Sequence, residues 1–94
     1  MENYGGLKET EYMTAKNDFK FEIINELGVI SKSSKGWRKE LNRISWNGAE
    51  PKYDIRDWDS KHEKIGKGVT LTERELRKLK ELIDAEVAFL ENGT

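Results

Sequence analysis

The chain has 94 residues, of which 35% are hydrophobic and 37% are charged, and it contains no cysteine. A chain of this length forms one small domain that buries roughly two thirds of its unfolded surface. The lack of cysteine excludes disulfide bonds, thiolate metal sites and a cysteine nucleophile. There is no run of about 20 apolar residues and no signal-peptide pattern, so we expect a cytoplasmic protein without a membrane partner.

The net charge of −1 conceals an uneven distribution along the chain. Residues 31–67 contain ten lysines and arginines against six aspartates and glutamates, which gives this segment a net charge of +4. A basic middle segment is typical of a surface that binds a polyanion.

Residues 1–17 follow neither a helical nor a strand period, so we expect a flexible N-terminal tail ahead of one domain over residues 18–92. From Phe19 to Val29 apolar residues alternate with polar ones, which predicts a strand with one buried face. A second strand is expected over residues 37–46, where the apolar residues change parity. Either a β-bulge near residues 42–43 switches the face, or one large apolar pair is exposed.

Two more strands are expected over residues 52–59 and 65–71, the first of them after a turn that ends at Pro51. Thr72 and Glu75 form a capping box, which predicts a helix that ends near Asn92. The predicted fold is therefore α+β, with a four-stranded antiparallel sheet followed by one C-terminal helix (β-β-β-β-α).

The predicted helix has a one-sided apolar stripe, with residues spaced three and four apart. This stripe packs on the sheet of its own chain or on a second copy. Because one sheet and one helix leave apolar surface uncovered at this size, we favour a homodimer. The residues expected in the dimer interface are Leu76, Leu79, Ile83 and Val87.

The sequence does not favour an enzyme. His62 is the only histidine, and a lone histidine in a loop is usually solvated. Asp57 and Asp59 are more simply explained as partners of nearby cations than as a catalytic pair. The Gly-Lys-Gly of residues 66–68 is too short for a phosphate-binding loop. We expect no cofactor, no metal and no small-molecule substrate.

Binding of single-stranded nucleic acid is favoured more strongly, because it requires aromatic rings for bases set among cations for phosphates. All three tryptophans lie within residues 37–58, among lysines and arginines that we assign to strands. The alternative is that these tryptophans belong to the core, Trp37 above all, and that the cations only keep the outer face soluble. Composition alone favours neither the nucleic-acid-binding role nor the core role of these tryptophans. The predicted nucleic-acid-binding residues are Lys39, Arg43, Trp46, Lys52, Arg56, Trp58 and Lys67.

Three motifs carry a family resemblance: residues 46–48 (Trp-Asn-Gly), 53–58 (Tyr-Asp-Ile-Arg-Asp-Trp) and 67–71 (Lys-Gly-Val-Thr-Leu) ahead of a capped helix. Over residues 19–90 the chain resembles the positive cofactor four family of transcriptional coactivators, and is most similar to its short bacterial YdbC-like branch. The resemblance implies a curved sheet, dimer contacts through the C-terminal helix, and single-stranded DNA on the concave face of the sheet.

The resemblance also assigns roles to particular residues. Arg56 matches the strand arginine that meets the nucleic-acid backbone, and Trp46 matches the aromatic residue before a hairpin turn. Trp58 falls in an aromatic cluster, while Lys67 and Lys39 match basic residues of the fourth and second strands. The chain departs from the eukaryotic members at residues 57–58, where they carry a doubled aromatic, and at Gly66 and Ile44, where they carry basic residues.

We therefore predict a homodimeric single-stranded DNA-binding protein with low sequence specificity. RNA is the alternative ligand, since a contact to the 2′-hydroxyl has no sequence signature. A β-sheet dimer that binds a polypeptide is the second reading. A compact RNA-binding barrel, which predicts five strands and a monomer, is the third. Transcription, replication and repair all expose single strands, so the sequence does not indicate the cellular process.

Overall fold

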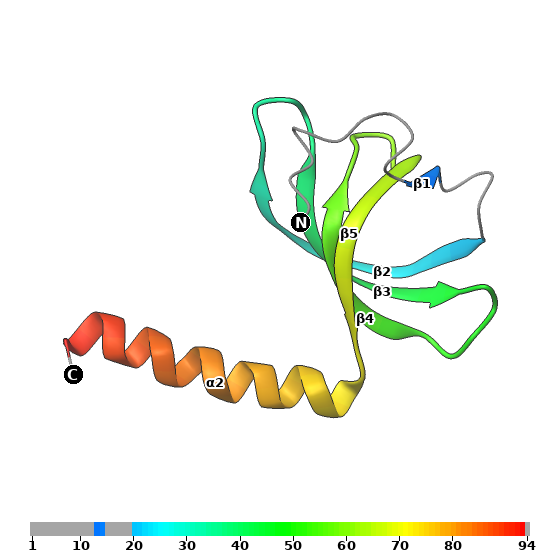
Figure 1. Ribbon diagram of the computed structural model, residues 1–94. Coiled ribbons are helices and arrows are strands. Elements are labelled where there is room, and N and C mark those ends of the chain that lie inside the picture. The colour runs from blue at the N-terminus through cyan, green and yellow to red at the C-terminus, as the bar shows by residue number, and fades with distance from the viewer. Residues whose placement is uncertain (1–12, 15–19, 94) are drawn as a thin grey trace.

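The computed structural model describes residues 13–14 and 20–93. The helix projects away from a strongly curved sheet (Figure 1). The elements are β1 (Met13–Thr14), β2 (Phe21–Lys32), β3 (Arg38–Trp46), β4 (Lys52–Trp58), β5 (Lys64–Leu71) and α2 (Glu73–Asn92).

The strands β2 to β5 each pair with their neighbour in the chain, and all the pairs are antiparallel. The predicted four strands followed by one helix are confirmed. Short β1 adds a strand at the far edge, where Met13 pairs with Ile65 and Thr14 with Lys64. Met13 and Thr14 fall within the N-terminal tail expected over residues 1–17. The other residues of that tail lie outside the described residues, so its flexibility stays a prediction. Within the described residues β1 does not pair with β2, and the sheet is open.

The sheet has two faces that differ in their contents. We call inner face the one that carries the buried core of Ile44, Trp58 and Ile65. We call helix face the opposite one, where Leu41 and Ile55 line a groove together with α2. Phe21, Ile23 and Trp46 are partly buried and pack against the core of the inner face.

Strand β3 contains no bulge, although its apolar residues change parity. Its pairing with β4 runs without interruption from Arg38 opposite Trp58 to Ile44 opposite Lys52. Both sequence-based explanations for the change of parity are therefore wrong. Leu41 belongs to the helix face and Ile44 to the inner face, and neither is exposed because both faces of the strand are covered. Trp37 precedes β3 and is partly buried.

The irregularity lies in β2, which contains three extra residues relative to β3. The register shifts between Ile23 and Asn25, between Glu26 and Gly28, and between Val29 and Ser31. The single buried face predicted for this strand is therefore wrong beyond its first residues, because each bulge reverses the alternation. Leu27 and Val29 are 50% and 47% exposed.

Helix α2 begins as predicted, with the Thr72 side chain accepting from the Glu75 N–H and the Glu75 side chain accepting from the Thr72 N–H. It ends at Gly93, whose left-handed backbone (φ 71°) favours glycine. The helix is not apolar enough to cross a membrane. It buries no residue fully, and Ile83 and Val87 are 49% and 43% exposed.

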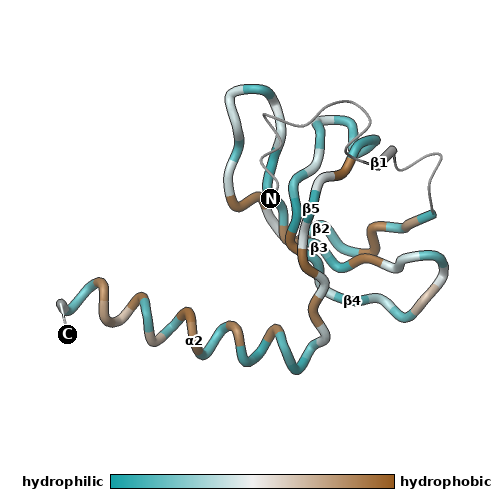
Figure 2. The backbone as a smooth tube through the Cα atoms, in the orientation of Figure 1, coloured by the Kyte–Doolittle hydropathy of each residue, from teal (hydrophilic) through white to brown (hydrophobic). Residues whose placement is uncertain are grey.

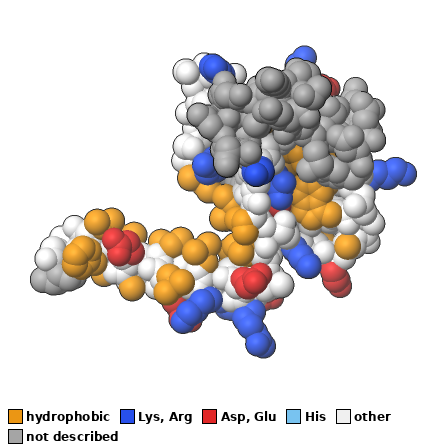
Figure 3. Space-filling view, viewed as in Figure 1, with side chains coloured by type: hydrophobic (Ala, Val, Ile, Leu, Met, Phe, Trp, Pro, Cys, Tyr) orange, Lys and Arg blue, Asp and Glu red, His pale blue; other side chains and the backbone are white. Residues whose placement is uncertain are grey.

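The groove between α2 and the helix face has a volume of about 650 Å³. Hydrophobic residues recur along the length of the helix (Figure 2), and hydrophobic side chains continue from it onto the adjoining part of the sheet (Figure 3). Leu76 and Leu79 line this groove together with Ile83, while Val87 lies further along the helix. A single chain thus leaves the stripe uncovered along most of the helix, and the homodimer stays a prediction.

Candidate nucleic-acid interface

Trp46 and Arg56 form the centre of the predicted site. Trp46 is the last residue of β3, and Arg56 lies on the inner face of β4. The guanidinium carbon of Arg56 is 4.9 Å from the centre of the Trp46 ring, and the Phe21 ring lies 5.8 Å from that ring on the side of β2. The structure therefore brings together two of the predicted residues, an aromatic ring and a cation, and places Phe21 beside them.

Arg56 is anchored within the protein through three of its N–H groups. Its Nε and Nη2 donate to the two carboxylate oxygens of Asp54 at 2.6 and 2.8 Å, and its Nη1 donates to the Gly66 carbonyl at 3.3 Å. Thr70 Oγ1 also donates to Asp54, at 3.0 Å. The Asp54 side chain is fully buried and that of Arg56 is 11% exposed. The positive charge of Arg56 is thus matched by a carboxylate in direct contact.

Gly68 explains how Arg56 fits between the strands. It pairs with Arg56 across β4 and β5, and a Cβ at this position would overlap the Cβ of Arg56 and the carbonyl oxygen of Ile55. A residue with a side chain would force β5 away from β4 or displace Arg56. Glycine is therefore required here by close backbone approach.

Trp58 does not present its ring outward, and the expectation that it offers an exposed face is wrong. Its side chain is 0% exposed and lies between two rings, with the centres of Phe21 and His62 each 5.2 Å away. Its indole N–H is buried, and no acceptor for it is found among the residues that the structure describes. Trp58 shares the parity of Arg56, so the strand pattern placed it on the correct face but did not reveal what covers it.

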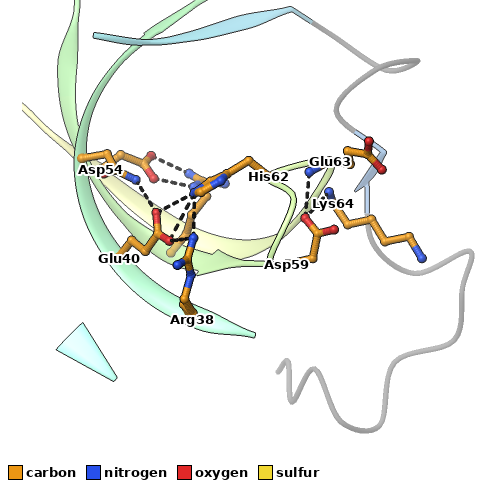
Figure 4. Close-up of polar contacts among 9 residues, drawn as sticks. Arg38, Glu40, Asp54, Asp59, His62, Glu63 and Lys64 are labelled. Atoms are coloured by element: carbon orange, nitrogen blue, oxygen red, sulfur yellow. Dashed lines mark hydrogen bonds and ion pairs between the residues drawn. The ribbon is translucent and has the colours of Figure 1, made fainter. Parts of the chain in front are cut away.

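A buried polar cluster around Glu40 lies beside Trp58 and was not predicted. Figure 4 shows Arg38 and His62 pointing toward Glu40 on the inside of the curved sheet. Glu40 Oε2 is 3.0 Å from Arg38 Nη2, and its Oε1 is 3.0 Å from both His62 Nε2 and Asn42 Nδ2. His62 is therefore partly buried and held by Glu40, whereas a solvated loop residue was expected.

The cluster keeps the Glu40 carboxyl ionised. Burial by itself raises the pKa of Glu40, but hydrogen bonds from Asn42 and His62 and the charges of His62 and Arg38 outweigh it, so the pKa lies below its usual value. A signal for this cluster was present in the sequence. Glu40 and Asn42 have the same parity as Ile44, so a strand puts all three side chains on the face that carries the core.

Asp59 has a structural contact that accounts for its position. Its carboxylate accepts from the backbone N–H groups of Glu63 and Lys64 at 2.7 and 2.8 Å, and so closes the turn between β4 and β5 (Figure 4). Within the part of the chain that the structure describes, no group of three or more His, Asp or Glu side chains could hold a metal ion.

The predicted cations are divided between the two faces. Lys52 is exposed at an inner-face position of β4, and Lys67 is exposed where β5 has an extra residue relative to β4. Lys39 and Arg43 have the opposite parity in β3 and belong to the helix face, where Arg43 Nη1 donates to Asn25 Oδ1 at 3.3 Å. The inner face therefore unites Trp46, Arg56, Trp58 and Lys52, and excludes Lys39 and Arg43.

The described residues thus form an open antiparallel sheet with one C-terminal helix and an aromatic–cation pair on its inner face. A family model for the transcriptional coactivator p15 (PC4) matches residues 33–82, slightly more than half of the chain. A protein of Treponema pallidum (strain Nichols), described as uncharacterized, is 43% identical over 79 residues, which are 84% of this chain and 93% of that relative. The chain belongs to the PC4 family, whose members are non-enzymatic DNA-binding proteins and coactivators, and this membership supports a nucleic-acid-binding role.

Proposed function

We propose that this protein binds single-stranded DNA as a homodimer with low sequence specificity, and that the strand lies on the inner face of the sheet. Family membership supports nucleic-acid binding in general. The observation that carries the finer proposal is the Trp46 ring, partly buried at the end of β3 and 4.9 Å from the guanidinium carbon of Arg56. A duplex hides the faces of its bases, so this arrangement favours unpaired nucleotides.

Trp46 is the proposed seat of a base, and each base stacked on an aromatic ring contributes about 1–3 kcal/mol. Phe21 is partly exposed and lies beside it, so it extends the apolar surface that a base can contact. Trp58 serves a different purpose in this proposal. It belongs to the core and packs against Phe21, and so supports the apolar surface that Trp46 and Phe21 form.

Lys52 and Lys67 are the proposed phosphate contacts, because they are exposed on the strands that carry Arg56 and its neighbour Gly68. Lys39 and Arg43 lie on the helix face, so a strand confined to the inner face does not reach them. Their predicted role in binding requires a nucleic acid that passes around the edge of the sheet.

The proposed dimer joins two copies through α2. Its apolar stripe is exposed in one chain, and the groove beside it is lined by Leu41, Ile55 and Leu76 among others. A second copy presents the same stripe and the same groove, so a two-fold arrangement covers both at once. This interface uses the helix face and leaves the inner face of each sheet accessible.

Tryptophan fluorescence tests the function directly. Oligo(dT), poly(U) and a matched duplex are titrated side by side at moderate salt. We expect oligo(dT) to quench the emission, the quenching to reverse as salt rises, and the duplex to bind far more weakly. Equal binding of duplex and oligo(dT) contradicts the proposal.

Two other outcomes of the same titration identify the alternatives. Tighter binding of poly(U) than of oligo(dT) makes RNA the ligand. No response to any nucleic acid leaves the β-sheet dimer that binds a polypeptide. We place the protein in the cytoplasm, at sites where transcription, replication or repair exposes single strands.

A further inference from the structure

The contacts of Arg56 are those of a residue that orients another side chain. We propose that Arg56 is a positioning residue, which holds the Trp46 ring as the seat of a base, and that it does not neutralise a phosphate. This inference rests on the proposed function, because it concerns the same site.

The charge of Arg56 is already compensated inside the protein. Asp54 is 0% exposed and receives two hydrogen bonds from the guanidinium, at 2.6 and 2.8 Å, while the Arg56 side chain is 11% exposed. A bidentate pair of this kind fixes the guanidinium plane as well as its position. A phosphate that approached Arg56 would also meet the repulsive field of the adjacent Asp54 carboxylate.

The contacts form a chain that runs from β5 to the end of β3. Thr70 donates to Asp54 at 3.0 Å, Asp54 accepts from Arg56, and the guanidinium carbon of Arg56 lies 4.9 Å from the Trp46 ring centre. The Gly66 carbonyl holds the third donor of Arg56 at 3.3 Å. Because each contact limits the next, the Asp54 carboxylate influences the orientation of Trp46 through Arg56.

A lysine cannot replace Arg56 in this arrangement. Its ammonium is a point charge and has no plane to place against an aromatic ring, whereas the guanidinium has both a fork and a flat face. A phosphate contact, in contrast, tolerates lysine because it requires mainly the charge. The two roles of Arg56 therefore predict different results for the same substitutions.

The Asp54→Asn variant gives the sharpest contrast, because the two roles predict opposite signs. If Arg56 neutralises a phosphate, removal of the opposing carboxylate charge tightens oligo(dT) binding. If Arg56 positions Trp46, removal of the ionic anchor weakens binding by about tenfold. Weaker binding with retained cooperative unfolding supports the proposal, and tighter binding overturns it.

The salt dependence of binding provides a second contrast. For a single strand, each phosphate contact contributes about −0.7 to the slope of log affinity against log salt. We expect Arg56→Gln to weaken binding and leave the salt slope unchanged. The control variant Arg43→Gln should also leave the salt slope unchanged. Arg56→Lys does not restore the affinity. A slope that becomes less steep by about 0.7 in Arg56→Gln, with affinity restored in Arg56→Lys, overturns the proposal.

A readout without nucleic acid separates this inference from the proposed function. The indole N–H signals of the tryptophans are recorded by NMR and the Trp46 signal is assigned with Trp46→Phe. We expect Asp54→Asn and Arg56→Lys to shift the Trp46 signal and leave the Trp37 signal in place. An unmoved Trp46 signal overturns the positioning role. If the wild-type chain binds no single strand, the proposed function fails, whereas the Trp46 signal still decides whether Arg56 orients that ring.

Discussion

Gly68 lies opposite Arg56 in the β4–β5 pair, with its backbone so close that an added methyl group would overlap Arg56 and the Ile55 carbonyl. We expect Gly68→Ala to destabilise the fold by about 1–3 kcal/mol, because the strands must separate or Arg56 must move. Urea denaturation measures the change. Gly28→Ala is the matched control, since no described residue other than its chain neighbours lies within 4 Å of a Cβ at that position of β2. Equal stability of the two variants would contradict the close approach.

Trp46 and Trp58 are expected to separate binding from stability. Trp58→Leu removes part of a fully buried ring and should lower the free energy of unfolding by an amount on the order of 3 kcal/mol. Trp46→Leu should weaken oligo(dT) binding by about 1–3 kcal/mol and destabilise the fold less. Trp37→Phe serves as the control for both measurements. Unchanged oligo(dT) affinity in Trp46→Leu would remove Trp46 from the interface.

The exposed lysines are expected to act through charge alone. Replacement of Lys52 or Lys67 by Gln should reduce the magnitude of the salt slope by about 0.7 for each phosphate that the lysine no longer neutralises. Lys39→Gln, on the helix face, should leave the slope unchanged if the strand stays on the inner face. The affinity for oligo(dT), measured at several salt concentrations, gives the slopes. A smaller slope in Lys39→Gln would show that the nucleic acid reaches both faces.

Glu40 is expected to make stability depend on pH. Its pKa in the folded chain lies below the value of 4.5 for an unperturbed carboxyl, so the folded state binds the proton more weakly than the unfolded state. The stabilisation is therefore present above pH 4.5 and is lost as the pH falls through the folded pKa. Urea denaturation at neutral and acidic pH should show a smaller loss in Glu40→Gln than in the wild type. Glu63→Gln, in the loop after β4, is the control, and an equal loss in all three proteins would rule out this role of Glu40.

Ile83 is expected to control assembly. It lies in the apolar stripe of α2 and is 49% exposed in the single chain, so Ile83→Asp should leave the fold intact and yield monomers. Ala85→Asp adds the same charge on the opposite side of the helix, about 160° away, and should not affect assembly. Sedimentation equilibrium measures the mass of each variant. A wild-type protein that is monomeric at high concentration would contradict the proposed interface.

The main elements could be predicted because their signals are local. The capping box at Thr72 and Glu75 marks the start of α2, and Gly93 follows its last turn. Alternation together with turn residues located β4 and β5 to within one residue. The bulges of β2 escaped prediction because they depend on the pairing with β3 and have no signature in β2 itself.

The site could be predicted only in part, because burial depends on contacts between distant residues. Trp46 and Trp58 have the same chemistry and both belong to the inner face, but Phe21 and His62 cover the second of them. Arg56 and Asp54 are two residues apart on one face of β4, so their ion pair could have been inferred from the strand period. The contact of His62 with Glu40 joins residues 22 positions apart and is visible only in the fold.

The three bulges of β2 have a consequence for how the protein behaves in solution. This strand forms one edge of the open sheet, and its extra residues include Ile24, Leu27 and Ile30, which are 37%, 50% and 57% exposed. A straight edge with such side chains would recruit strands from other molecules and seed aggregates. The bulges break the regular spacing of its backbone donors and acceptors, so no long run of them matches an incoming strand. We therefore expect this aliphatic edge to be a poor template for fibrils.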